Sequence, residues 1–147
     1  MKDINLQLRK AYVNKLTGIV VNLIPIKTFY LQAPDSDLNN NYIVIEQISN
    51  SDDSTMNSED LSVNVTVRIV TQEIKANNGR DADFIAGEVL KRIIPSPQSK
   101  SNLDAFGITN LHARLSNDQV MNYCEQGGTS FVDRIIVFNH QIFIHQP

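Results

Sequence analysis

One segment of the chain alternates strictly between apolar and polar residues over nine positions. From Leu61 to Ile69, every odd position is apolar and every even position is polar, ending with Arg68. Successive side chains of a strand point to opposite faces of a sheet, so this segment predicts a strand with one buried and one solvated face. Such a strand needs a second layer to cover its apolar face.

Two amphipathic helices are predicted to provide that layer. Between residues 4 and 16, apolar residues recur every three or four positions, and Gly18 follows where a left-handed residue ends a helix. Between residues 82 and 93, apolar residues form one stripe. Asn78 is the expected cap of this second helix, with Asp81 as its partner in a capping-box pair.

Further extended segments complete an α-β-β-β-α-β-β order. A polar loop, Ser49–Asp60, is expected between two strands, and Gly127-Gly128 marks a hairpin turn. We therefore predict an α+β fold, one domain over residues 1–147, with two helices packed on an antiparallel (mixed) sheet. The other extended segments are Ile19–Ile24, Thr28–Leu31, Tyr42–Ile48, Asn110–Cys124 with a bulge at Ser116–Asp118, and Phe131–Ile144.

Length and cysteine content suit an ordinary intracellular domain. The chain has 147 residues and is 41% hydrophobic, enough to build a core without a disulfide or a metal. Cys124 is the single cysteine, so no internal bridge forms, which fits a reducing compartment. No signal peptide and no apolar run long enough to span a bilayer is found. We expect a soluble protein without a membrane partner, made in the cytoplasm.

Charge is distributed unevenly along the chain. The net charge is −3, which argues against a dedicated nucleic-acid binder. No lysine or arginine lies between Lys27 and Arg68, whereas seven acidic residues do. The rest of the chain holds 13 basic and nine acidic residues and therefore carries a net charge of +4. Chance clustering in two solvated loops is the plainer interpretation. The seven acids of this stretch are Asp35, Asp37, Glu46, Asp52, Asp53, Glu59 and Asp60.

A calcium loop is the closest match to a metal-binding motif. Asp35, Asp37, Asn39 and Glu46 occupy positions 1, 3, 5 and 12 of a loop of the EF-hand kind. Asn40 replaces the usual glycine, and the flanking segments read as extended where that motif needs helices. A polar turn is the alternative interpretation. We expect no metal site and retain these four residues as a weak candidate.

No pattern of catalytic residues stands out. The three histidines, His112, His140 and His145, have no metal-ligand spacing and are expected at surface or half-buried strand positions. Nothing places Cys124 beside a histidine, and no nucleophile elbow or phosphate loop is present. We predict a non-enzymatic protein without a cofactor.

The order of elements resembles that of the tail terminator (tail completion) proteins of long-tailed bacteriophages. The resemblance covers roughly residues 3–146 and lies in order, length and pattern: the first helix, proline-broken short strands, YIVIEQI, LSVNVTVRIVTQE, RDADFIAGEVLKRI and a final hairpin ending in RIIVFNHQIFI. It implies a virion protein that forms a ring, usually a hexamer, at the head-proximal end of the tail. Such a ring caps the tail tube, stops its elongation and attaches the neck or head completion proteins.

The resemblance gives the acidic stretch a purpose. DNA passes through such a ring without specific binding, and an acidic lumen loop would repel its phosphates. Asp52, Asp53, Glu59 and Asp60 are the candidate lumen residues. A head–tail connector (neck) protein is the alternative within the same class. A small calcium- or ligand-binding module is the alternative from another class.

Overall fold

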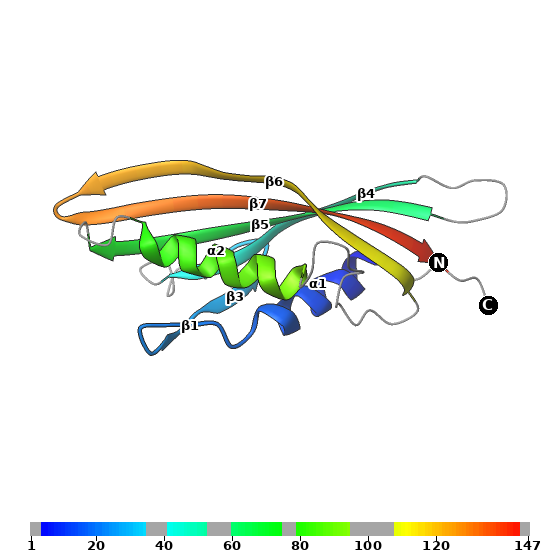
Figure 1. Ribbon diagram of the computed structural model, residues 1–147, viewed down its shortest axis with the longest axis horizontal. Helices are drawn as coiled ribbons and strands as arrows, with labels where there is room; N and C mark the ends of the chain where they lie inside the picture. Colours follow the sequence, from blue (N-terminus) through cyan, green and yellow to red (C-terminus); the bar gives the residue numbers. More distant parts are fainter. Residues whose placement is uncertain (1–3, 35–40, 53–59, 75–78, 95–107, 145–147) are drawn as a thin grey trace.

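The computed structural model describes residues 4–34, 41–52, 60–74, 79–94 and 108–144. It confirms the predicted α+β class, with two helices and a mixed sheet (Figure 1). Five strands separate the helices instead of the three expected. The elements are α1 (Ile4–Leu16), β1 (Val20–Val21), β2 (Ile24–Pro25), β3 (Lys27–Tyr30), β4 (Tyr42–Asp52), β5 (Asp60–Ile74), α2 (Arg80–Ile93), β6 (Ile108–Gln126) and β7 (Thr129–Ile144).

The main sheet has five strands in the order β3-β4-β5-β7-β6. Only β3 and β4 pair in parallel; the other neighbours are antiparallel. The central strand, β5, pairs with β7 along its whole length, from Asp60 opposite Phe143 to Ile74 opposite Thr129. The long strands therefore set the long axis of the molecule, and β3 and β6 form its two edges (Figure 1).

The hydrophobic core lies between this sheet and the two helices. The alternation predicted for β5 is confirmed, because Val63, Val65, Val67 and Ile69 are fully buried. They pack in one cluster with residues of both helices, which places α1 and α2 on the same face of the sheet. Neither described helix has the length and hydropathy of a membrane-spanning segment. The helical members of the cluster are Leu8, Ala11, Tyr12, Leu16, Ile85, Ala86, Val89 and Ile93.

The opposite face of the sheet is covered over only a small area in the described part of the chain. Tyr42 and Val44 alternate with the core residues of β4 and therefore point to this second face. They form a separate cluster with Ala33, and Phe29 and Val70 pack against it. The rest of this face lacks a covering helix among the described residues.

The segment Ile19–Ile24 is a tight hairpin and not the continuous extended piece that was expected. Val20 and Val21 pair with Pro25 and Ile24, while Asn22 and Leu23 both have positive φ angles of 51° and 69°. Positive φ at both central residues is what a two-residue hairpin turn needs, and glycine normally supplies it. The sequence hides this turn because a leucine stands where glycine is usual.

The predicted boundary between β4 and the polar loop is also wrong. β4 was expected to end at Ile48, but it continues to Asp52, with Ser49 to Asp52 paired to Asn64 to Leu61. Because β5 is already held by β7, it offers β4 a fixed edge of hydrogen-bonding groups. Ladder bonds of this kind outweigh the low strand propensity of serine, asparagine and aspartate.

β6 is one strand of 19 residues with three shifts in register against β7. The shift between Leu115 and Asn117 confirms the bulge predicted at Ser116–Asp118. Two more shifts lie between Thr109 and His112 and between Val120 and Asn122. The turn to β7 contains Gly127 and Gly128, both with positive φ, as expected.

Candidate functional site

The calcium-loop candidate divides between described and undescribed parts of the chain. Asp35, Asp37 and Asn39 lie outside the described residues, whereas Glu46 is an exposed residue within β4, beside a shift in register. The segment is flanked by the parallel strands β3 and β4 and not by the helices that an EF-hand needs. Among the described residues, no cluster of three or more His, Cys, Asp or Glu side chains could hold a metal ion.

Two of the candidate lumen acids lie in strands rather than in a loop. Asp52 is the last residue of β4 and Asp60 the first of β5, and Asp60 is opposite Phe143 of β7. Asp53 and Glu59 lie outside the described residues. The β4–β5 hairpin extends past the helices at one end of the molecule (Figure 1). The strands therefore place Asp52 and Asp60 at one end of the long sheet.

One arginine from each helix contacts another element of the fold. Arg9 lies over the ring of Tyr30 at 4.6 Å. The Arg92 guanidinium donates hydrogen bonds to the carbonyl oxygens of Lys15 and Thr17, at 3.1 and 2.8 Å. These carbonyls belong to the C-terminal end of α1, where unpaired oxygens and the helix dipole favour a cation. α2 thus fixes the end of α1 through one arginine.

The N-terminus of α2 is capped by a side chain of β5 and not by a residue directly before the helix. Gly79 is the N-cap residue, in a left-handed conformation and without a side-chain cap bond. Glu73, only 3% exposed, accepts hydrogen bonds from the backbone N–H groups of Asp81 and Ala82 at 3.1 and 3.2 Å. Thr71 Oγ1 also donates to this carboxylate.

The predicted capping box is therefore wrong in the part that can be checked. Asn78 lies outside the described residues, and the Asp81 backbone N–H is bonded to Glu73. Partial burial, and next the nearby Glu73 carboxylate, raise the pKa of Asp81. Sequence spacing could not reveal this cap, because Glu73 belongs to β5 and lies eight residues before Asp81, outside the spacing of a capping box.

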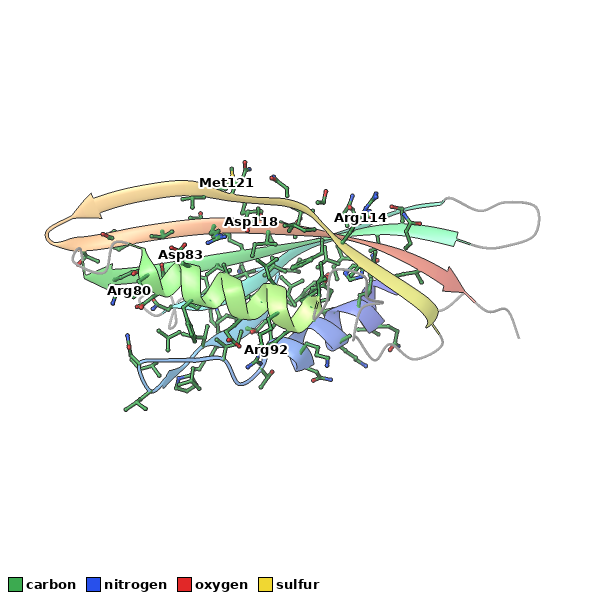
Figure 2. All side chains as sticks on the ribbon, viewed as in Figure 1. Arg80, Asp83, Arg92, Arg114, Asp118 and Met121 are labelled. Carbon is green, nitrogen blue, oxygen red and sulfur yellow. The ribbon has the colours of Figure 1, made fainter. Side chains whose placement is uncertain are left out.

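Arg134 of β7 joins three elements. Its guanidinium makes two hydrogen bonds of 2.8 Å with the Asp118 carboxylate of β6, and a third of 2.9 Å with Asp83 of α2. The hydrogen bond to Asp118 is the main cause of the raised pKa of Arg134. Asp118 and Asp83 lie on either side of β7, on the strand and the helix that the guanidinium ties together (Figure 2).

His140 is fully buried, which corrects the expectation of a surface or half-buried position. Its Nε2 atom is hydrogen-bonded to the hydroxyl of Tyr12 on α1, which is also fully buried. Burial lowers the pKa of His140 to about 4 and raises that of Tyr12 well above its ordinary value. Both groups are neutral at pH 7, and both are closed off from solvent, so the pair is part of the core.

The uncovered face of the sheet carries an ordered polar network. The Arg68 guanidinium donates two hydrogen bonds to the Asp133 carboxylate across β5 and β7, one of them 2.7 Å long. Asn139 Nδ2 donates to Ser62 Oγ and Asn64 Oδ1 at 3.0 and 2.9 Å. These cross-strand bonds engage Arg68, Asp133 and the Asn139 amide nitrogen, whereas the buried Asn139 Oδ1 has no hydrogen-bond partner among the described residues.

Exposed large apolar side chains occur on two segments that the sequence analysis did not single out. The first, which we name the hairpin surface, consists of Val20, Leu23, Ile24 and Leu31. The second, the β6 surface, consists of Leu115, Val120 and Met121. The available sequence signal for the first was an apolar Leu-Ile-Pro run, Leu23–Pro25, directly after Asn22, a residue type common in turns.

Comparison with known proteins gives a likeness in structure but not in sequence family. No family model matches the chain, and no curated protein matches it. The fold is similar to that of a chain in the solved virion of a native gene transfer agent (GTA) particle, with a TM-score of 0.47 and 17% sequence identity. The match covers 95% of this chain and 90% of that chain.

Proposed function

We propose that this chain is a structural, non-enzymatic virion protein of a phage-like particle and that it acts as a tail terminator. Copies of it form a ring, usually a hexamer, that caps the tail tube at its head-proximal end. The ring stops elongation of the tube and presents a surface to the neck or head completion protein. DNA passes through the ring without specific binding.

The observation that carries this proposal is the position of the acidic β4–β5 hairpin. Its strands keep Asp52 and Asp60 at one end of a long sheet, beyond the helices (Figure 1). The cations Arg9, Lys10 and Lys91 lie on the helical layer. A ring that turns the acidic ends toward its axis would line a channel that repels phosphate, as free passage of DNA requires.

The arrangement of elements gives the proposal further support. The resemblance to tail terminators rests on the order of two helices and a long-stranded sheet, and the described elements follow that order. The charged groups Glu73, Arg134 and Asp118 are engaged in an internal cap and in a cross-strand ion pair. A role in assembly therefore needs no chemistry beyond the surfaces of the molecule.

Tail-tube length tests the proposal. Particles that lack this chain should build tubes of uncontrolled length that fail to join heads, and supplying the chain should restore one length. The purified chain should also bind one end of tubes assembled from the tail tube protein of the same genome. Tubes of normal length that fail only to join heads would instead identify a neck connector. Normal particles without the chain would contradict both roles.

A further inference from the structure

We infer that protonation of His140 releases α1 from the sheet in mild acid, while the strands beneath the helix stay paired. The helix and the sheet meet at one buried polar pair, the hydroxyl of Tyr12 on α1 and Nε2 of His140 on β7. Both residues are fully buried. The opened state would expose the apolar face of α1 and the part of the sheet that this helix covers.

The surroundings of His140 do not accommodate a second proton on its ring. One ring nitrogen is bonded to Tyr12, and the other, Nδ1, is buried without a hydrogen-bond partner among the described residues. The charged ring carries an N–H group on both nitrogens, so Nδ1 would become an unpaired donor within a buried cation. Burial accordingly lowers the pKa of His140 to about 4. At higher pH the ring takes up a proton only when it reaches water.

The described neighbours of His140 offer no charge of opposite sign. In the sheet, Val63 of β5 and Ala113 of β6 lie directly opposite His140. From the helical layer, α1 places the hydroxyl of Tyr12 beside it. Burial raises the pKa of Tyr12 well above its ordinary value, so this hydroxyl stays neutral. A proton on His140 would therefore add an uncompensated charge to the core.

The charged residues of the two helices are engaged elsewhere. Asp83 of α2 is paired with Arg134 at 2.9 Å. Glu88 lies 3.6 Å from Arg92 on the same helix. The third helical carboxylate, Asp81, is at the start of α2, where the Glu73 cap binds. The remaining charged residues of α1 and α2 are cations, which would oppose a charge on His140: Arg9, Lys10, Lys15, Arg80 and Lys91.

The backbone ladder on both sides of β7 leaves α1 as the part that can move. β7 pairs with β5 and with β6, so water reaches His140 through the sheet only if inter-strand hydrogen bonds break. From the other side, the ring of Tyr12 covers His140 edge-on, with 5.5 Å between the ring centroids. α1 is held by side-chain packing and not by a ladder. Proteins open locally in such units at a lower free energy than global unfolding needs.

The size of the effect follows from the two pKa values of His140. The ring binds a proton near pH 4 while α1 is docked, and near pH 6.5 once the helix is released and the ring meets water. Acid therefore favours the opened state, whereas above pH 6.5 the helix stays docked. Lowering the pH from 7 to 5 should raise the equilibrium constant for opening by about twentyfold.

Hydrogen exchange of the purified chain tests the inference. It is measured by mass spectrometry at pH 7 and pH 5 and corrected for the intrinsic exchange rates. We expect peptides of α1 to lose protection by about twentyfold at pH 5 and peptides of β5 and β7 to keep theirs. His140→Gln should abolish this loss, since glutamine does not titrate. Tyr12→Phe is the matched control: it removes the hydrogen bond but leaves His140 buried, so the loss at pH 5 should remain.

A second variant keeps the test decisive if glutamine prevents folding. His140→Leu fills the same core position with an apolar side chain that does not titrate, and its α1 should also stay docked at pH 5. Protection of α1 that is equal at both pH values would overturn the inference. So would strands that lose protection together with α1, or an equal loss in both His140 variants. A loss confined to α2 would overturn it too, and would assign the acid effect to the carboxylates at the start of that helix.

Discussion

At the scale of single residues, the buried His140 makes stability depend on pH. Its pKa is about 4 in the folded chain and about 6.5 when exposed. The unfolded chain therefore binds the proton first, so the stabilisation is complete above pH 6.5 and is lost as the pH falls toward 4. The loss amounts to about 3 kcal/mol of the free energy of unfolding.

Denaturant unfolding between pH 4 and pH 7 measures this effect. His140→Gln should flatten the curve in that window, since glutamine does not titrate. Tyr12→Phe is the control: it removes the hydrogen bond but leaves His140 buried, so the dependence on pH should remain. If His140→Gln leaves the dependence of the free energy of unfolding on pH unchanged, groups other than His140 cause that dependence.

Glu73 supplies a second prediction at this scale. Glu73→Gln keeps the shape of the side chain but removes the charge that accepts the two N–H bonds at the start of α2. We expect a loss of roughly 1–3 kcal/mol in the free energy of unfolding, the range for a buried, charge-assisted bond. Glu46→Gln, at an exposed site, should change the free energy by less than about 0.5 kcal/mol. Equal losses in both variants would show that Glu73 does not cap the helix.

At the scale of elements, the β4–β5 hairpin carries the prediction for DNA passage. Reversing the charge at Asp52, Asp53, Glu59 and Asp60 to lysine should leave the melting temperature within a few degrees and reduce infectivity. A basic channel lining would hold the phosphates that must slide past it. Asparagine or glutamine at the same four positions should have a smaller effect. Full infectivity of the lysine variant would exclude a role of this hairpin in the channel.

The elements also show how far local sequence determines this fold. The alternation of β5 and the apolar stripe of α2 were readable because each follows the geometry of its own element. The continuation of β4 to Asp52 was not, since it depends on pairing with β5. The Glu73 cap and the positive φ of Leu23 were hidden for similar reasons. Contacts made across elements set these features, and spacing along the chain does not record them.

For the candidate site, sequence reasoning located the acidic segment but not its surroundings. The absence of cations between Lys27 and Arg68 is visible in the sequence. That Asp52 and Asp60 stand at one end of a long sheet follows only from strand pairing. The hairpin and β6 surfaces were missed because exposure of an apolar residue is a property of the folded chain.

At the scale of the whole molecule, the proposed function requires a closed ring of copies. The most direct test is the native mass of the unchanged chain over a wide range of concentrations, with and without calcium. We predict a single closed assembly, of six copies, whose mass and stability are the same in both conditions. A chain that stays monomeric at every concentration, and whose melting temperature rises with calcium, would contradict the ring and favour a calcium-binding module.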